Sequence, residues 1–368
     1  GSTVGFFIAP GEVQLGETGR VSPLNNLNIA GPSRLYGDVE VLGQFNSNGQ
    51  LGLANDVTIT ANELLFENSI VNEDKIVRGM TVNAASRLEI QAVVGFGGMP
   101  INHFRSISSA PIFLTSGIGI TTREDQLYGG PVSLGDDFEL TGSAMTLGDS
   151  VELNTHSLTI NTSLQGGAAT GPISGTGAFI KQGAGGFALT GDNTFTGGLF
   201  VDEGNLQLIG STVAASPVSV SNAALQGTGI AGGAVALTAS VLAPGISPGQ
   251  LDTGDLIFDS GSALAIEVDG LIPGTEHDQV FVTGSVTLDG AALTVSGSYV
   301  PNGQGAEIIL IENDGNDPVL DLFIGQPEGA MVQTGNGVLA ISYVGGDGND
   351  VVLMDTEAIF ADNFETLN

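Results

Sequence analysis

The sequence predicts an all-β fold, a right-handed parallel β-helix (β-solenoid) that forms a single elongated domain with a less regular C-terminal cap. Three observations predict it: apolar and polar residues alternate over short runs, Gly, Asn or Asp interrupts these runs roughly every ten residues, and one block of sequence recurs. Alternation of period two indicates strands with one buried face. Interruptions this close leave no room for helical crossovers, so a sandwich or a solenoid must hold the strands, and the recurrence favours the solenoid.

The composition suits many short strands joined by tight turns. The chain has 368 residues, 41% of them apolar, with 57 Gly, 14 Pro and neither Cys nor Trp. This apolar content is ample for a sizeable core, and Gly supplies turns with positive φ. The absence of Cys fits an exported bacterial repeat protein, which avoids mispairing in an oxidising compartment. The first residues lack the basic start of a signal peptide, so we expect the numbering to begin after any leader.

Charge is unevenly distributed along the chain. The formal net charge is −32, and the last basic side chain is Lys181, so residues 182–368 contain no Lys or Arg. Such a field repels nucleic acid and anionic lipid, and we expect neither as a partner. Residues 205–251 carry no charge, but Gly, Ser, Thr, Asn, Gln and Pro interrupt them throughout, so we expect no membrane insertion. Clustered carboxylates invite cations, and calcium is the natural candidate outside cells.

The strand-like runs follow one another along the whole chain. The block Leu35–Gly43 (LYGDVEVLG) recurs at the same length as Leu127–Gly135 (LYGGPVSLG), which indicates one supersecondary unit used twice. We divide the chain into four parts: a strand segment at 1–27, solenoid repeats at 28–170, a distinct repeat region at 171–250 and an acidic β region at 251–368. The clearest alternating runs are 57–60, 87–90, 138–142, 157–160, 205–210, 262–268 and 338–343.

Residues 175–211 (GTGAFIKQGAGGFALTGDNTFTGGLFVDEGNLQLIGS) closely resemble the autotransporter-associated β-strand repeat. Residues 120–154 (ITTREDQLYGGPVSLGDDFELTGSAMTLGDSVELN) are similar to filamentous haemagglutinin-like repeats. The resemblance implies a passenger-type protein that is extracellular or displayed on the bacterial cell surface, with a structural or adhesive role. The family's membrane-anchored C-terminal part has no counterpart in the last residues, so we expect a passenger segment or a protein retained by other means. The matching positions are Lys181, Gly183, Gly185, Leu189, Gly191, Asn193, Thr194, Phe195, Thr196, Gly197, Gly198, Gly204 and Leu206.

Two Asp-rich segments near the C-terminus are candidates for a structural calcium site. Residues 345–353 (GGDGNDVVL) fit the calcium nonapeptide, with Asp350 at the ligand position and Asp347 nearby. A site of that kind forms between successive turns, so one copy supplies half the ligands. Residues 312–317 (ENDGND), with Asp314 and Asp317, supply either a partner or a simple turn, and solvated turns remain the alternative for both segments.

No constellation of residues indicates catalysis, and we expect no enzyme. His103, His156 and His277 lie far apart, so zinc is not expected. Residues 276–278 (EHD) lack a nucleophile elbow or an oxyanion-hole motif and are expected to be a loop. Polysaccharide lyases need Arg or Lys to hold acidic sugars, and the C-terminal half has none. A glycosidase, which needs only two carboxylates, stays open as an alternative.

Self-association is the most specific partner expected. The open ends of a solenoid carry unpaired strand edges, and residues 2–15 (STVGFFIAPGEVQL) are apolar and strand-like. We therefore expect head-to-tail docking of the N-terminal strand on a neighbouring copy, which builds a fibre. The alternative is a module that binds surface glycans or host surfaces through one flat face. Thr-x-Thr ladders are too sporadic for ice binding.

Overall fold

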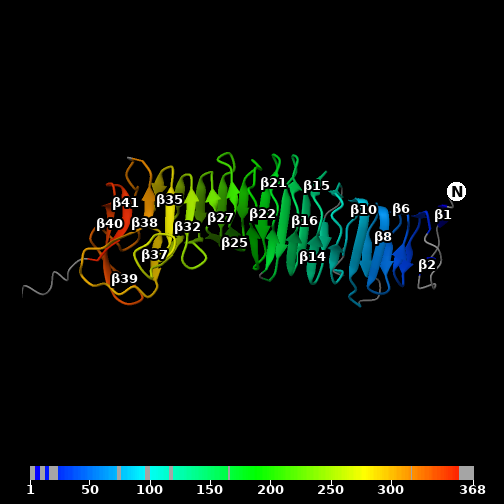
Figure 1. Ribbon diagram of the computed structural model, residues 1–368, viewed down its shortest axis with the longest axis horizontal. Coiled ribbons are helices and arrows are strands. Elements are labelled where there is room, and N and C mark those ends of the chain that lie inside the picture. The colour runs from blue at the N-terminus through cyan, green and yellow to red at the C-terminus, as the bar shows by residue number, and fades with distance from the viewer. Residues whose placement is uncertain are drawn as a thin grey trace, which may run out of the picture. The chain divides into compact units, whose positions relative to one another are not determined.

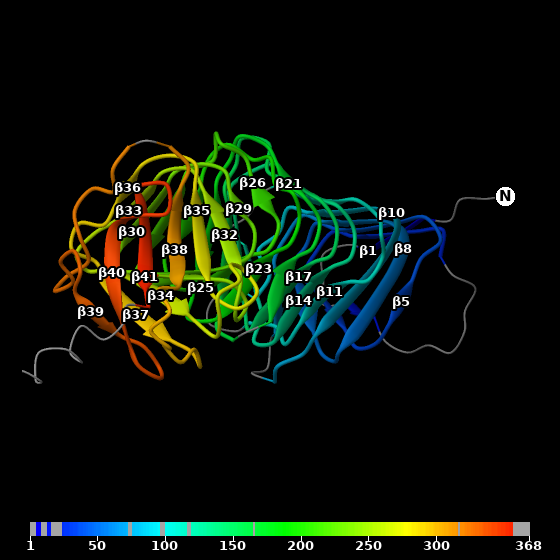
Figure 2. The ribbon, with the colours of Figure 1, turned by 60° about the vertical axis from the view of Figure 1, so that its left-hand side comes forward.

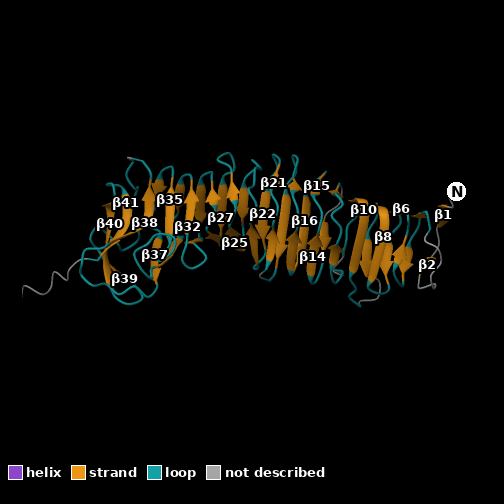
Figure 3. Cartoon of the chain, viewed as in Figure 1, coloured by secondary structure: helices purple, strands orange, loops and turns teal. Residues whose placement is uncertain are grey.

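The computed structural model describes residues 5–8, 13–15, 24–72, 76–95, 100–115, 119–164, 166–315 and 317–355. Within these residues the chain forms strands and loops, and no helix (Figure 3). The strands stack in parallel, so the predicted all-β solenoid is confirmed. The chain divides into two compact units, Gly1–Gly197 and Gly198–Asn368, and each is described by itself.

In the first unit, each coil contributes strands to three parallel faces, A, B and C (Figures 1 and 2). Face A holds β1 (Gly5–Ile8), β3 (Asn26–Ile29), β6 (Gln44–Ser47), β12 (Ile112–Leu114), β15 (Val132–Leu134), β18 (Val151–Glu152) and β21 (Ile173–Ser174). Face B holds β2 (Val13–Leu15), β4 (Ser33–Leu35), β7 (Leu51–Leu53), β9 (Ile70–Asn72), β13 (Gly119–Thr121), β16 (Phe138–Gly142), β19 (Leu158–Thr162) and β22 (Phe179–Gln182). Face C holds β5 (Val39–Glu40), β11 (Phe104–Ser106), β14 (Asp125–Tyr128), β17 (Ala144–Leu147), β20 (Gly167–Ala169) and β23 (Gly186–Leu189).

Two long strands, β8 (Val57–Phe66) and β10 (Met80–Ile90), run across faces C and A without a break. The first half of β8 pairs with β5 of face C and its second half with β6 of face A. β10 pairs with β8 along both halves, with a shift in register between Ala84 and Arg87. The corner between these faces is therefore made by a bulge, where an extra residue bends the strand.

The core of the first unit is a column of apolar side chains stacked coil on coil. Burial alternates along the strands as the sequence pattern requires, for example buried and part-buried in turn along β16 and β19. Aromatic rings stack on neighbouring coils: the ring centroids of Phe45 and Phe66 are 5.8 Å apart, as are those of Phe104 and Tyr128. Such pairs add stability beyond the apolar area that they bury.

Asp side chains at the corners join successive coils of the first unit. A carboxylate oxygen of Asp38 accepts from the backbone N–H of Thr58 at 2.7 Å, and Asp137 does the same for Ser157 at 2.7 Å. Side-chain hydrogen bonds between coils of the first unit join residues 18 to 28 apart, so the length of a coil varies. Each carboxylate satisfies a backbone donor that the turn leaves without a strand partner. Part of the high acid content therefore serves the architecture.

The two similar nonapeptides do not occupy equivalent positions. Leu35 lies at the end of β4 on face B, whereas Leu127 lies in β14 on face C. Tyr128 is fully buried in the core, and Tyr36 is only part-buried at a corner. The two nonapeptides are similar in sequence, but they do not form the same structural unit.

Within residues 1–27, the predicted docking segment, β1 pairs in parallel with β3 and β2 with β4. Residues 1–4, 9–12 and 16–23 lie outside the described residues. The described part of the segment thus continues the coils of faces A and B.

The second unit also forms three faces of strands, D, E and F. Face D holds β24 (Leu199–Val201), β27 (Val218–Ser221), β30 (Val235–Thr238), β33 (Leu256–Phe258) and β36 (Val286–Thr287). Face E holds β25 (Gly204–Leu208), β28 (Ala223–Gly227), β31 (Val241–Pro244), β34 (Ala263–Glu267) and β37 (Ala292–Ser296). Face F holds β26 (Ser211–Thr212), β29 (Ile230–Ala231), β32 (Gln250–Thr253), β35 (Gln279–Val282), β38 (Glu307–Asn313), β41 (Asp350–Met354), β40 (Val338–Gly345) and β39 (Met331–Gln333).

The parallel order of face F changes at its end. β38 pairs in parallel with β35 on one side and antiparallel with β41 on the other, and β40 and β39 follow as antiparallel strands (Figure 1). Phe323 packs under this hairpin: its ring centroid lies 6.3 Å from that of Tyr343, whose hydroxyl accepts from the Phe323 N–H at 3.1 Å. This is the less regular C-terminal cap that the sequence predicted.

Candidate functional site

The two Asp-rich segments proposed for calcium lie side by side in the second unit. The side-chain amide of Asn349 donates to the carbonyl oxygens of Gly315 and Asp317, at 3.1 and 3.0 Å. A carboxylate oxygen of Asp350 accepts from the backbone N–H of Asn313 at 2.8 Å. The antiparallel pairing of β41 with β38 brings the two segments together.

The four predicted ligands differ in their surroundings. Asp350 is buried, whereas Asp314, Asp317 and Asp347 are exposed. Across the described residues, no group of three or more His, Cys, Asp or Glu side chains has the geometry to hold a metal. The assignment of calcium to these residues stays a prediction.

The charges beside Asp350 are poorly compensated. Burial is the main cause that raises its pKa, and the charge of Asp347 and then that of Glu307 add to it. The pKa of Glu312 is also raised, first by burial and then by the charges of Asp350 and Asp347. The side-chain oxygen of Asn313 is buried and has no hydrogen-bond donor. A cation bound among these oxygens would offset the repulsion between the carboxylates and would give the Asn313 oxygen a partner.

Residues of the predicted passenger repeat are used inside the coils. Lys181 points into the core from β22, is 0% exposed and pairs in register with Ile160. Its ammonium group donates to the carbonyl oxygens of Gln182 and Gly183, at 2.6 and 2.7 Å. Burying a lysine is costly unless the charge finds such partners. Lys181 therefore holds the corner at which the chain leaves β22.

Asn193 and Phe195 have similar structural roles. The Asn193 amide oxygen accepts from the N–H of Ile173 one coil away at 3.0 Å, and its nitrogen donates to the Gly191 carbonyl at 2.8 Å. The ring centroid of Phe195 lies 6.3 Å from that of Phe179, so the two aromatic rings pack together in the core. These residues of the repeat pattern therefore join neighbouring coils.

The segment EHD forms part of a loop, as expected. Glu276 accepts from the N–H groups of Leu271 and Ile272, at 2.9 and 3.1 Å, and so closes the loop on itself. His277 is 1% exposed, and its Nδ1 lies 3.2 Å from the Gly270 carbonyl. His103 and His156 belong to the first unit, where His156 lies 3.9 Å from Asp137. The histidines therefore share no site.

Two arginines of the first unit, Arg87 and Arg105, form ion pairs. Arg105 on β11 forms a two-pronged ion pair with Asp125 on β14, with distances of 2.8 and 2.7 Å. The hydrogen bonds to Arg105 are the main cause that lowers the pKa of Asp125. Arg87 donates to Glu89 at 2.5 Å and lies over the ring of Phe113, 4.6 Å from its centroid. The Arg105–Asp125 pair and the Arg87–Phe113 contact join neighbouring strands, whereas Arg87 and Glu89 both lie in β10.

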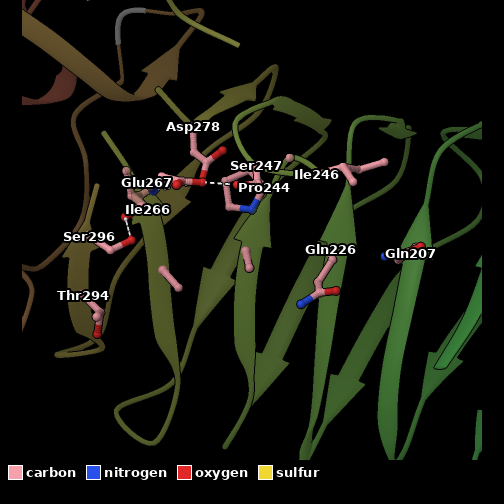
Figure 4. Close-up of a pocket in the computed structure, with 13 residues that line it drawn as sticks. Gln207, Gln226, Pro244, Ile246, Ser247, Ile266, Glu267, Asp278, Thr294 and Ser296 are labelled. Carbon is pink, nitrogen blue, oxygen red and sulfur yellow. Dashed lines mark hydrogen bonds between the residues drawn. The ribbon is translucent and has the colours of Figure 1, made fainter. Parts of the chain in front are cut away.

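Sequence reasoning missed a groove on face E of the second unit (Figure 4). The groove has a volume of about 370 Å³, and Glu267, Ser247, Gln226 and Gln207 line it. The Ser247 hydroxyl donates to the carboxylate of Glu267. Polar residues such as Gln207, Gln226 and Thr294 at alternate positions of these strands could have indicated the groove. The sequence alone, however, does not show which strands are neighbours.

Asp278 lies at the end of this groove and organises it. Its two carboxylate oxygens accept from the N–H groups of Gly249 and Glu267, each at 2.8 Å. Burial is the main cause that raises its pKa to about 6, against the effect of these hydrogen bonds. Asp278 is therefore a structural support for the loop at 245–249 and for the end of β34.

Residues 179–208 match the family model of the passenger-associated-transport-repeat. A stretch of 98 residues is 42% identical to a protein named extracellular serine protease from Serratia marcescens. The stretch covers 26% of this chain and 9% of that relative, so the chain spans only a small part of the relative. In the described residues no helix has the length and hydropathy needed to cross a bilayer.

The resemblance to autotransporter passengers that carry this repeat is confirmed by the family match and the fold. Together they support an extracellular, passenger-like β-solenoid, either secreted or held at the cell surface. The repeat residues Lys181 and Asn193, which carried the resemblance, act as supports inside the first unit.

Proposed function

We propose that the chain is a non-catalytic structural and adhesive segment of a bacterial surface protein. The observation that carries the proposal is the use of the repeat signature: Lys181 and Asn193 direct their polar groups to backbone atoms of the coils. Other molecules can therefore contact only the outer surface of the coils, where Thr, Ser, Gln and Asp side chains alternate with buried side chains along the strands. A solenoid of this kind presents long, regular faces to other surfaces.

Display of the chain on a bacterial surface tests the adhesive role. Cells that display residues 1–368 are expected to adhere to glass and to one another more than cells that display nothing. A matched control displays the variant Phe179→Ala, Phe195→Ala, which removes stacked rings from the core and should unfold coils of the first unit. Equal adhesion of all three strains would refute the adhesive role.

Self-assembly is a second candidate, and the end of the second unit supports it. Leu320, Leu322 and Ile324 follow the last strand of face D and are 49%, 42% and 67% exposed. Leu320 forms a parallel bridge with Thr287 of β36. An edge with exposed apolar side chains favours association with another strand. We assign the N-terminal strand of a second copy as its partner, which gives head-to-tail polymers.

Electron microscopy of the purified chain tests this assembly. Filaments are expected from the chain, and short particles from the variant Leu322→Asp, Ile324→Asp and from a chain without its first twelve residues. Filaments that persist in both variants would exclude this mode of docking.

Calcium is proposed as a structural ligand between residues 312–317 and 347–350. The unpartnered oxygen of Asn313 and the raised pKa values of Asp350 and Glu312 support it. Calcium is expected to raise the melting temperature more than magnesium does at equal ionic strength, and Asp350→Asn is expected to abolish the difference. Asp289→Asn, at an exposed turn elsewhere in the unit, is the control. Equal effects of the two cations on the unchanged chain would contradict the site.

A further inference from the structure

The groove on face E offers a line of outward positions on five neighbouring strands. Gln207 of β25 pairs in register with Gln226 of β28, which pairs with Ala243 of β31. Ala265 of β34 pairs with Thr294 of β37. Neighbouring strands lie about 4.8 Å apart, so these side chains form a straight row of regularly spaced positions. The groove therefore suits an extended ligand.

The shape of the groove comes from side-chain size along this row. Ala243 and Ala265 lie between the glutamines and Thr294, and their small side chains leave the floor of the groove open. The loop after β31 forms a wall, with Ile246 54% exposed and Ser247 directed to Glu267 (Figure 4). The row therefore has Ile246 as an apolar contact on one side, the two glutamines at one end and Thr294 at the other.

The chemistry of these groups matches a ligand rich in hydroxyls. Each glutamine amide offers two donors and an acceptor, and the hydroxyl of Thr294 offers both. The Ser296 hydroxyl donates to the carbonyl oxygen of Ile266 at 3.3 Å and so remains available as an acceptor. Sugar hydroxyls need both kinds of partner, and the apolar Ile246 can contact the less polar face of a sugar ring.

Charge excludes one class of sugar. Glu267 and Asp278 line the groove, and the chain after Lys181 contains no Lys or Arg to hold an acidic group. An anionic glycan would find no Lys or Arg there to hold its charge and would be repelled by Glu267. An amino sugar would instead place its positive charge near Glu267.

We propose that this groove binds linear oligosaccharides without acidic groups, with an amino sugar preferred beside Glu267. The inference rests on the proposed adhesive role and names its ligand class. The glutamines Gln207 and Gln226 hold the hydroxyls, Ala243 and Ala265 make room for the sugar rings, and Glu267 selects for positive charge.

Calorimetry with the full chain and three probes tests the groove: a glucosamine hexamer, a neutral glucose hexamer and a galacturonate hexamer. A salt concentration of about 0.3 M suppresses general attraction of the cationic probe to this acidic protein. The expected order of affinity is glucosamine above glucose, with no binding of galacturonate. Absence of binding by both non-acidic hexamers, or binding of galacturonate, would overturn the proposal.

Three variants place the binding in the groove. Ala243→Gln repeats the residue of the neighbouring strand, so the fold should tolerate it, and it should weaken both non-acidic probes at least tenfold by filling the floor. Glu267→Gln should remove the preference for the amino sugar, so that the affinity for glucosamine falls to that for glucose. Gln44→Ala, at an exposed position in the first unit, is the control and should change neither. Affinities unaffected by Ala243→Gln would also overturn the proposal.

Cells that display the Ala243→Gln chain separate this inference from the adhesive role. Loss of binding to immobilised glucosamine hexamer with retained adhesion to glass supports the groove. If the unchanged chain adheres to glass but binds neither hexamer, the groove proposal alone fails. If it adheres to no surface, the adhesive role fails as well.

Discussion

Asn193 joins two coils through both ends of its side-chain amide. Because it is buried, loss of the amide leaves the N–H of Ile173 and the carbonyl of Gly191 without these partners. Unsatisfied buried groups cost about 1–3 kcal/mol each. We expect Asn193→Ala to lower the free energy of unfolding by about 2–4 kcal/mol, measured by urea denaturation. Thr194→Ala, at the exposed neighbouring position, should change it by less than about 0.5 kcal/mol. Equal effects of the two substitutions would contradict this role for Asn193.

Asp278 predicts an unusual dependence of stability on pH. Burial raises the pKa of this carboxyl from 3.8 to about 6. Between these values the folded chain binds a proton that the unfolded chain releases, so the contribution of Asp278 to the free energy of unfolding increases as pH falls from about 7 to about 4. We expect Asp278→Asn to reduce the rise in melting temperature over this range, as followed by circular dichroism.

Asp269 is the matched control for this titration. It is exposed, and hydrogen bonds from Ser298 lower its pKa below 3.8. Its stabilising effect is present above pH 3.8 and is lost only as pH falls through the lower, folded pKa. Asp269→Asn should therefore leave the slope between pH 7 and about 5 unchanged. A slope that Asp278→Asn also leaves unchanged would show that Asp278 does not titrate as described.

At the scale of elements, coils approach so closely that some corners admit only glycine. A Cβ atom at Gly177 would lie 1.7 Å from the carbonyl oxygen of His156 on the preceding coil. Both residues lie in bends between strands, and one of the two backbones would have to shift to admit the Cβ atom. We expect Gly177→Ala to destabilise the first unit by about 1–3 kcal/mol, measured by chemical denaturation.

Gly261 in the second unit provides the comparison for Gly177. A Cβ atom there would find its nearest neighbour at 3.4 Å, which is an ordinary contact. Gly261→Ala should therefore be tolerated within about 0.5 kcal/mol. A similar loss at both positions would mean that backbone freedom of glycine, rather than the close approach of coils, sets the cost.

The strands were predictable from sequence because alternation is a local signal. Runs such as 138–142 and 157–160 lie within or overlap β16 and β19 and alternate in burial as expected. Pairing was less predictable, because side-chain hydrogen bonds between coils of the second unit join residues from 17 to 30 apart. Coil length also varies in the first unit, from 18 to 28 residues by the same measure, and the two similar nonapeptides lie on different faces there.

The candidate sites were predictable only in part. The two Asp-rich segments were recognisable in sequence because each contains Asp, Asn and Gly in a turn-like order. Their contact through Asn349 was left open, because the sequence does not show that β38 and β41 pair. The groove beside Glu267 could not be predicted, because its row depends on the register of five strands. The burial of Lys181 could not be predicted either. It depends on the carbonyl groups of Gln182 and Gly183, which accept hydrogen bonds from its ammonium group after β22 ends.

At the scale of the whole molecule, the net charge of −32 opposes compact folding. Like charges repel over about 10 Å at 0.1 M ionic strength, and added salt screens them. We expect the melting temperature to rise by several degrees between about 10 mM and about 300 mM sodium chloride. A melting temperature that falls or stays constant would show that the carboxylates are balanced locally, as in the Arg105–Asp125 pair.

The partial similarity to a serine protease leads to a prediction about catalysis. We expect the chain to hydrolyse neither casein nor a fluorogenic peptide, and to cleave neither neutral nor acidic polysaccharides. The reason is that Asp278, Glu276 and His277 are each engaged in loop contacts rather than grouped for proton transfer. Turnover by the pure chain that Glu267→Gln abolishes would instead indicate a glycosidase.

The buried position of Lys181 makes the bond that follows it a reporter of core opening. Trypsin cleaves after Lys and Arg, and beyond this bond it finds no further site, because residues 182–368 have neither residue. Lys181 is 0% exposed and lies within β22, so the intact coil hides the bond from the enzyme. Release of the acidic fragment 182–368 therefore measures how often this one coil unravels, without any label or engineered cleavage site.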